Sequence, residues 1–307
     1  MTTDFRMLMI GAMYENGGNT SHRFLDGHPE LFVYPFESQI GTRMVQDHLS
    51  SMFPVKYRWP VFALDATPAE DFHAIIDEEG KVRSRTPHVS KFRHMPFDMS
   101  DEERGRIYAE HVKKTGRSRA HNVAAFFQAT FDAWKDFKRS GRERIYVGYS
   151  PIITVDAAAI LSDMPNAHFL HIVRNPWSAY ADTKKRPVPL SLDKYLLAWT
   201  LNQYFALLVK EQFPKRLHIV RTEDVMADST AALGPVCDAL GIERAASLKQ
   251  PSWNGAPLEE VYPWGTIRKA TPAQNKAEAQ SLSAGERDAI RQRAWQYLDV
   301  FDYRSFV

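Results

Sequence analysis

Four short apolar runs, separated by segments with helical periodicity, restrict the fold of this chain more than any other feature of its sequence. The runs cover residues 6–12, 144–150, 168–174 and 216–221. Short runs dominated by apolar residues are typical of strands buried on both faces of a parallel sheet. The segments with helical periodicity cover residues 22–26, 121–138, 154–164, 191–213 and 229–242, and a last helix begins near Ser283. This alternation predicts an α/β fold, with a doubly wound, mostly parallel sheet flanked by helices.

We expect the chain to form a single domain over residues 1–307. Its length suits one large α/β domain, and the sequence contains no internal repeat, low-complexity segment or linker. Residues 57–96 are rich in proline, arginine and histidine and lack a sustained period, so we interpret them as an excursion or lid that faces the substrate. Tyr57, Trp59 and Phe62 in this region could stack on sugar or aryl rings. A contact within a homodimer fits the same composition.

Charge and cysteine content exclude several classes of function. The formal net charge is only +2, so the chain as a whole does not attract nucleic acid, and any anion site must be local. Cys237 is the sole cysteine, which excludes an intramolecular disulfide and a multi-cysteine metal site and fits a reducing compartment. His168 and His171 cannot bind one metal ion together, because residues three apart on a strand face opposite sides. No apolar run is long enough to span a membrane, and we expect a soluble, cytoplasmic protein without a metal cofactor.

Two anion-binding features are predicted at one edge of the sheet. The loop after the first strand, "NGGNT", leads into a helix, and the backbone N–H groups of such a loop form a cradle for an anion. Its residues are Asn16, Gly17, Gly18, Asn19 and Thr20. Arg174 ends the strand 168–174 and offers a permanently charged fork of donors that suits phosphate. Since ligands of parallel sheets bind at the carboxyl ends of the strands, the two features suggest a ligand with two anionic ends.

Four segments resemble, in order, motifs of the sulfotransferase family. "PNAHFLHIVRNPWSAYAD" (165–182) is similar to the family's 3′-phosphate-binding segment, and "LHIVRTEDVMADSTAALGPVCDALGI" (217–242) to the strand, turn and helix that follow it. "NGGNTSHRFLDGHPELFVYPFES" (16–38) resembles the opening loop, and "WGTIRK" (264–269) a late basic segment. The resemblance implies a P-loop NTPase-like sulfotransferase fold. It also implies transfer of the sulfuryl group of 3′-phosphoadenosine-5′-phosphosulfate (PAPS) to a hydroxyl or amine of a carbohydrate or other small-molecule acceptor, with adenosine 3′,5′-bisphosphate (PAP) as product.

The resemblance also implies roles for individual residues. The loop amides would hold the 5′-phosphosulfate, and Arg174, Arg268 and Lys269 would hold the 3′-phosphate. Glu37 falls close to the position of a catalytic glutamate in carbohydrate- and tyrosine-modifying relatives, so it is the candidate general base. His22, on the first helix, could instead donate a proton to the leaving oxygen or compete with Glu37 as the base.

Three positions depart from the motifs of the family. Where the family has a lysine or arginine in its opening loop, this chain has Glu15 or, with a shift of one residue, Asn16. Asp182 replaces a serine eight residues after the arginine, although Thr183 beside it could supply the hydroxyl. Tyr149 replaces a lysine.

These departures leave two functions open. The first is a PAPS-dependent sulfotransferase. The second is a protein of the same fold that has lost or changed its donor, either a non-catalytic binding module or a transferase that uses another nucleotide. For the first function the missing loop cation would come from elsewhere, such as His22, Arg23, Lys184, Lys185 or the basic stretch 81–94.

Overall fold

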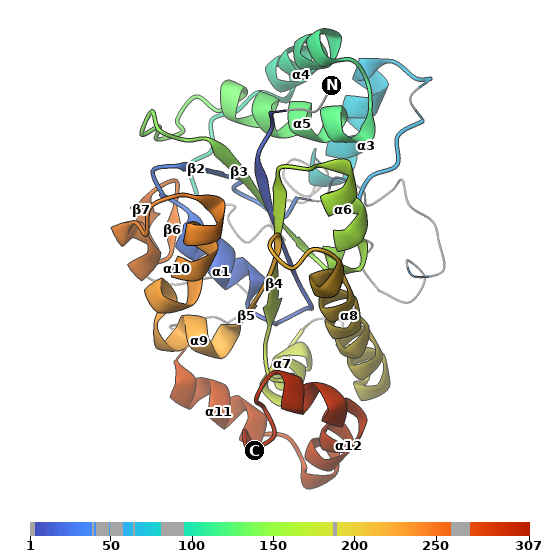
Figure 1. Ribbon diagram of the computed structural model, residues 1–307, viewed down its shortest axis with the longest axis vertical. Coiled ribbons are helices and arrows are strands. Elements are labelled where there is room, and N and C mark those ends of the chain that lie inside the picture. The colour runs from blue at the N-terminus through green and yellow to red at the C-terminus, as the bar shows by residue number, and fades with distance from the viewer. Residues whose placement is uncertain are drawn as a thin grey trace.

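The fold is built on a five-stranded sheet with β1 at its centre. In the computed structural model, which describes residues 4–38, 40, 49, 58–63, 65–80, 95–186, 189–258 and 271–307, the strands pair in the order β2-β3-β1-β4-β5 (Figure 1). Every pairing within this sheet is parallel. The strands are β1 (Met7–Ala12), β2 (Leu31–Val33), β3 (Ile145–Pro151), β4 (Ala167–Val173) and β5 (Leu217–Arg221). A short antiparallel pair, β6 (Ser252–Trp253) and β7 (Ala256–Pro257), completes the described strands.

Helices cover both faces of the sheet (Figure 1). Leu8 and Ile10 of β1 pack with apolar residues of α1 and α10, whereas Met7 and Met9 pack with α5 and α6 on the opposite face. This division follows from the two-residue period of a strand. The helices are α1 (Gly18–Leu25), α3 (Pro68–Gly80), α4 (Asp101–Thr115), α5 (Arg119–Ala133), η3 (Ile153–Asp156), α6 (Ala157–Asp163), α7 (Pro176–Thr183), α8 (Leu192–Gln212), α9 (Thr222–Ala227), α10 (Ser229–Leu240), η4 (Ala246–Lys249), α11 (Pro272–Gln280) and α12 (Ala284–Val300).

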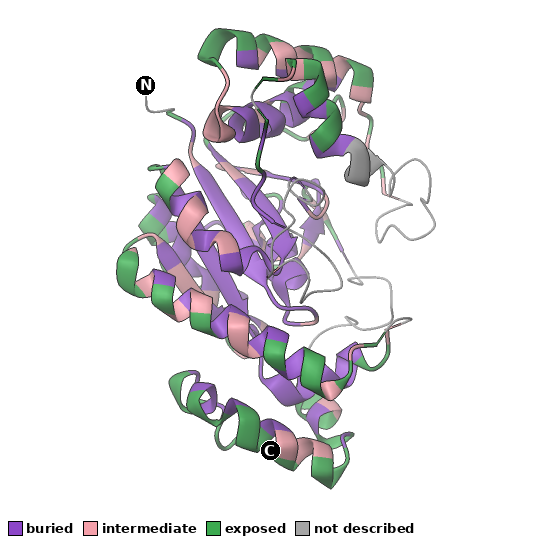
Figure 2. Cartoon of the chain, turned by 90° about the vertical axis from the view of Figure 1, so that its right-hand side faces the viewer, coloured by how far each residue is buried: buried purple, intermediate pink, exposed green. Residues whose placement is uncertain are grey.

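A second apolar cluster lies beyond the carboxyl ends of β1 and β4. It brings together α7, α8, α11 and α12, and the side chains of Trp177, Tyr195 and Trp199 are fully buried in it. Figure 2 shows strands that are buried almost throughout and helices that are exposed along their outer faces. No helix in the described part of the chain is both long and apolar enough to cross a membrane.

The predicted doubly wound α/β architecture is confirmed, with differences in individual elements. The helix predicted for 121–138 ends at Ala133, and Trp134 beyond it packs against the rings of Phe131 and Phe137. Five α-helices of the described residues have no predicted counterpart: α3, α4, α7, α9 and α11. In α4 only Arg104, Tyr108 and Val112 are buried, so its apolar period is too weak to reveal a helix.

The described parts of the predicted excursion at 57–96 pack against the body of the protein. Trp59 is 2% exposed, and its Nε1 donates to Asp163 Oδ2 at 2.7 Å. Phe62 joins the same core cluster. These two rings therefore belong to the core, where large aromatic side chains bury much apolar area, and neither stacking on a ligand nor a dimer contact, the two roles left open for them, is supported by their position. Tyr57 and the stretch 81–94 lie outside the described residues, and a role of this region in substrate binding stays a prediction.

His171 belongs to a buried polar network that joins β4 to η3 and α8. Its Nδ1 lies 2.9 Å from Thr154 Oγ1, and its Nε2 lies 2.7 Å from Gln203 Oε1. His168 lies on the other face, where its Nδ1 is 3.0 Å from His218 Nε2, which confirms that the two histidines of β4 point apart. Within the described ranges no group of His, Cys, Asp and Glu is arranged to hold a metal ion. Burial lowers the pKa of His171 to about 4.

We expect the free energy of unfolding to decrease as the pH is lowered from about 6.5 to about 4, because the unfolded chain binds a proton at His171 that the folded chain does not bind. This histidine alone contributes a slope of up to about 1.4 kcal/mol per pH unit. His171→Gln should remove that part of the slope in urea denaturation curves recorded across this pH range. His73→Gln, on the exposed side of α3, is the control and should leave the slope unchanged. An unaltered slope in His171→Gln would show that the buried imidazole is not responsible.

Candidate functional site

The side chain of Asn16 fixes the opening loop between β1 and α1. Its Oδ1 accepts hydrogen bonds from the Arg174 N–H (3.1 Å) and from Trp199 Nε1 (3.2 Å), and its Nδ2 donates to the Tyr14 carbonyl (2.6 Å). Thr222 Oγ1, at the start of α9, donates to the Asn16 carbonyl (2.5 Å). The Asn16 side chain is fully buried. It therefore anchors the loop to β4, α8 and α9, and its polar atoms are used within the protein.

Gly17 and Gly18 allow the backbone to approach its neighbours closely at the N-terminus of α1. Gly17 precedes the helix with φ at 81°, in the left-handed region that favours glycine. A Cβ at Gly17 would lie 2.4 Å from Thr222 Oγ1, and a Cβ at Gly18 would lie 2.5 Å from Tyr149 Cε2. The first N–H groups of a helix have no acceptor within it. The backbone at Gly17 and Gly18 thus lies close against Thr222 and Tyr149, and anion binding by its amides, including those of Asn19 and Thr20, stays a prediction.

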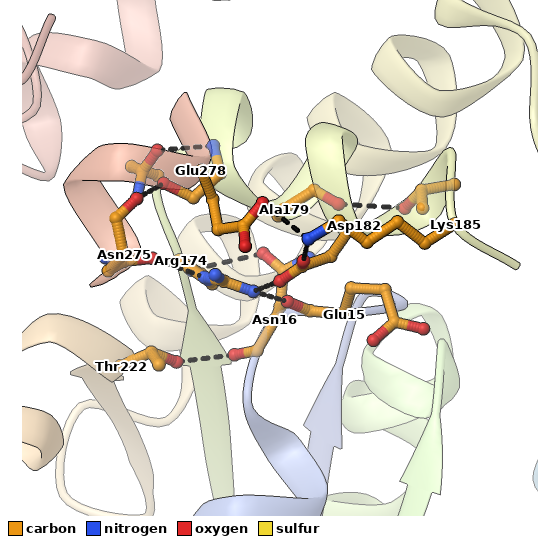
Figure 3. A network of polar contacts seen from close by, with 12 residues as sticks. Glu15, Asn16, Arg174, Ala179, Asp182, Lys185, Thr222, Asn275 and Glu278 are labelled. Atoms are coloured by element: carbon orange, nitrogen blue, oxygen red, sulfur yellow. Dashed lines mark hydrogen bonds and ion pairs between the residues drawn. The ribbon is translucent and has the colours of Figure 1, made fainter. Parts of the chain in front are cut away.

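Arg174 is buried at the end of β4 and is engaged by three acceptors of the protein itself (Figure 3). Its Nε donates to Asn275 Oδ1, and its Nη1 donates to the Glu15 carbonyl and to Asp182 Oδ2, each at 2.8 Å. The three acceptors come from α11, the opening loop and α7. Arg174 thus joins three segments that are distant in sequence, and its charge is compensated by Asp182.

Asp182 connects Arg174 to further charged groups (Figure 3). Its side chain is 4% exposed, and its Oδ1 lies 3.0 Å from Lys185 Nζ. Lys185 Nζ also lies 2.5 Å from Glu278 Oε2 on α11. The carboxylate that stands where the family has a serine is therefore not a repulsive group in isolation. It is the central partner of two cations.

Three other predicted nucleotide contacts have different outcomes. Thr183 donates its hydroxyl to the Ala179 carbonyl within α7 (2.9 Å), so the hydroxyl that was expected to replace the family's serine is used inside the helix. Ser and Thr side chains commonly bond the carbonyl four residues before them in this way. Arg268 and Lys269 lie outside the described residues.

Glu37 and Tyr149 lie together at the end of β3. The Tyr149 N–H donates to Ser38 Oγ (3.1 Å), and the Ser38 N–H donates to the Tyr149 carbonyl (2.6 Å). These two bonds place Glu37, which is partly exposed, beside the end of the strand. Burial raises the pKa of the Tyr149 phenol well above its usual value, and the negative charges of Glu37 and Glu15 raise it further. Tyr149 is thus a neutral donor where the family has a lysine.

His22 is buried on α1, with its ring centroid 5.6 Å from that of Tyr149. Arg23 Nη2 donates to its Nδ1 at 2.9 Å. Burial lowers the pKa of His22 well below its usual value, and the charge of Arg23 lowers it further. A neutral imidazole whose lone pair already accepts a hydrogen bond is poorly suited to donate or accept a proton. This arrangement favours Glu37 over His22 as the candidate base.

Arg186 is the described cation from the run Lys184-Lys185-Arg186 that contacts the opening loop. Its guanidinium lies 4.9 Å from the centroid of the Tyr14 ring, and its Nη1 is 3.4 Å from Glu15 Oε1. Lys184 instead pairs with Glu286 on α12 at 2.8 Å. The sequence indicated Lys184 and Lys185 as possible sources of the missing loop cation. No pattern in the sequence shows that their neighbour Arg186 is the residue that reaches the loop.

Two residues of the site, Asn275 and Glu223, were not predicted. Asn275 binds Arg174 through its Oδ1, and its Nδ2 donates to Glu223 Oε1 at 3.0 Å. Glu223 Oε1 also accepts from Asn175 Nδ2 (2.7 Å), and its Oε2 accepts from Tyr303 OH (2.6 Å). No local pattern marks these residues, because their partners lie far away in sequence.

Comparisons with known proteins identify relatives over most of the chain. A profile of the sulfotransferase family matches residues 21–246. Among solved structures, the sulfotransferase domain from the Synechococcus PCC 7002 olefin synthase is 18% identical, with a TM-score of 0.60 over 99% of this chain and 96% of that chain. The sulfotransferase domain from the curacin biosynthetic pathway is 15% identical, with a TM-score of 0.50 over 97% of this chain and 98% of that chain. No curated protein matches the sequence significantly. At these identities the likeness in structure concerns the fold alone.

We expect Gly17→Ala to destabilise the protein more than Gly241→Ala does. Both positions have positive φ, but a Cβ at Gly17 meets Thr222, whereas a Cβ at Gly241 meets nothing within 4 Å. Backbone strain should cost both variants about 1–2 kcal/mol, and overpacking should cost Gly17→Ala about 1–3 kcal/mol more. Chemical denaturation measures the difference. An equal decrease in the free energy of unfolding of the two variants would mean that the loop and Thr222 move apart without a measurable cost.

Proposed function

This chain belongs to the sulfotransferase family, and on that premise we propose that it transfers a sulfuryl group from PAPS, or from a close analogue of PAPS, to a hydroxyl or amine of a carbohydrate or other small molecule. The observation that carries the proposal is the loop at the centre of the sheet. Gly17 and Gly18 bring the backbone amides of α1 to the carboxyl end of β1, where ligands of parallel sheets bind. The end of a helix that presents its N–H groups favours an anion.

Glu37 fits the role of general base in such a transfer. The acceptor oxygen attacks the sulfur, the bond between sulfur and the bridging phosphate oxygen breaks, and the proton of the acceptor passes to Glu37. Negative charge then develops on the leaving phosphate oxygen. The amides at the start of α1 would stabilise this charge, and positioning and electrostatics would supply most of the rate, as in phosphoryl transfer.

Two described groups would compensate for the cation that the opening loop lacks. Arg186, just beyond the C-terminal end of α7, contacts the loop at Tyr14 and Glu15. Tyr149 offers a phenol that stays protonated, since burial raises its pKa. A hydrogen bond from a neutral donor is weaker than one from a cation. We therefore expect slower turnover than with a loop lysine in place.

The second candidate function is a transferase that uses another nucleotide, and one observation favours it. Arg174, the residue that would receive the 3′-phosphate, is already paired with Asp182 at 2.8 Å. The two candidates share the fold, the loop and the base, and they differ in the part of the nucleotide that lies at Arg174.

Nucleotide binding and turnover test the proposal in sequence. Thermal unfolding with PAP and with adenosine 5′-monophosphate (AMP) comes first, since a ligand at 100 times its Kd stabilises the fold by about 2.7 kcal/mol. Incubation with PAPS, or with adenosine 5′-phosphosulfate (APS), and a panel of hydroxylated acceptors follows, with sulfated products detected by mass spectrometry. A protein that neither nucleotide stabilises at millimolar concentration would not be a nucleotide-dependent sulfotransferase.

We expect Glu37→Gln to lower kcat by about 10²–10⁴-fold, because the amide cannot take the proton of the acceptor. Nucleotide affinity, measured by calorimetry, should stay unchanged, since the loop and Arg174 are intact. Glu102→Gln, on the exposed surface of α4, is the matched control and should retain full activity. Unchanged turnover in Glu37→Gln would exclude this residue as the base.

A further inference from the structure

We infer that this site selects a donor nucleotide with a hydroxyl, rather than a phosphate, on the ribose carbon that faces Arg174. The inference rests on the proposed function, which places the 5′-phosphosulfate in the opening loop and the 3′ position of the ribose at Arg174. The donor is then APS or a related nucleotide with a free 3′-hydroxyl, and the nucleotide product is AMP.

The first argument is that Arg174, which would receive a 3′-phosphate, is already paired with an anion of the protein. Nη1 bonds both Asp182 Oδ2 and the Glu15 carbonyl, and Nε bonds Asn275 Oδ1. Asp182 lies on α7, which begins directly after Arg174 with Asn175 as its N-cap. The helix therefore holds the carboxylate about two turns beyond Arg174, at a fixed distance from its guanidinium. A phosphate would have to displace this carboxylate or lie beside it.

The second argument is electrostatic. Three cations and four carboxylates belong to the described network of ion pairs and hydrogen bonds around Arg174, so their charges sum to −1. They are Arg174, Lys185 and Arg186, and Glu15, Asp182, Glu223 and Glu278. Among the described groups this balance disfavours a phosphate dianion at Arg174, and the contribution of Asp182 is strong because its carboxylate is almost fully buried and poorly screened by water.

The third argument is that a ribose hydroxyl suits the same carboxylate. Each oxygen of Asp182 accepts one described hydrogen bond, from Arg174 and from Lys185, and a carboxylate oxygen can accept a second. Dinucleotide-binding folds use the same chemistry: an acidic residue binds a ribose hydroxyl, whereas an arginine accommodates a phosphate at that carbon. In this chain the arginine, Arg174, is present, but it forms an ion pair with Asp182.

The reaction balances with this donor. The acceptor oxygen forms a bond to sulfur, the bond between sulfur and the 5′-phosphate oxygen of APS breaks, and Glu37 takes the acceptor proton. The nucleotide leaves as AMP, and no oxidant, reductant or metal is needed.

Calorimetric titration of the full chain with AMP and with PAP tests the inference. In the unmodified protein AMP should bind at least about ten-fold more tightly than PAP, as expected for removal of one strong like-charge contact. Asp182→Ser restores a small hydroxyl and frees Arg174, and it should reverse the preference by raising the affinity for PAP. Asp182→Asn, which keeps the shape of the side chain but removes its charge, should reduce the difference between the affinities for AMP and for PAP.

Asp238→Ser is the matched control. Asp238 also pairs with an arginine, Arg244, but both side chains are exposed on the surface near α10. Its replacement should leave the ratio of the two affinities unchanged. If Asp182→Ser does not fold, the comparison of AMP with PAP in the unmodified protein and in Asp182→Asn decides the question.

The outcomes separate this inference from the proposed function. Binding of PAP that equals or exceeds that of AMP in the unmodified protein would overturn the hydroxyl preference and leave sulfuryl transfer from PAPS intact. An AMP preference that Asp182→Ser leaves unchanged would overturn the role of Asp182. Absence of binding by both nucleotides would overturn the inference together with the proposed function.

Discussion

The positive charge of Arg174 must be compensated inside the protein, because only 7% of the residue is exposed. A buried charge that loses its partner typically costs about 3–5 kcal/mol. Asp182 supplies the opposite charge, and the Glu15 carbonyl and Asn275 complete the hydrogen bonds. The opening loop, α7 and α11 therefore all contribute to the stability of the buried charge at the end of β4.

The C-terminal helices depend on the same edge of the sheet. Glu223, in the first turn of α9, connects Asn175 and Asn275 to Tyr303 near the end of the chain. Trp177 Nε1 donates to the Arg287 carbonyl at 3.0 Å, which ties α7 to α12. The segment that carries the candidate nucleotide contacts is thus covered by elements that come last in the sequence, and the site is complete only when they have docked.

Sequence reasoning reached the layers of the fold but only part of the site. Four of the five strands of the main sheet were predictable because burial on both faces leaves a nearly continuous apolar run, whereas the three-residue β2 was not predicted. The start of α12 was predictable because Ser283 and Glu286 form a local capping box. Arg174 was predictable as the end of such a strand. Its pairing with Asp182 was not, since the sequence marked Asp182 only as a departure from the family's serine.

The remaining differences also have physical causes. Asn275 reaches Arg174 across 101 residues of sequence, and such packing leaves no local pattern. Trp59 was considered for stacking on a ligand or for a dimer contact, but its indole bonds Asp163 in the core. The polar surface of α4 hid a helix whose formation depends on three buried side chains.

The burial of Asn16 also limits which side chains the opening loop can accept. Its amide makes hydrogen bonds to Tyr14, Trp199 and the backbone of Arg174 at the end of β4. A lysine or arginine at this position would lose these three bonds and bring a charge into a buried place. A loop cation therefore requires accompanying changes in the residues that now surround Asn16.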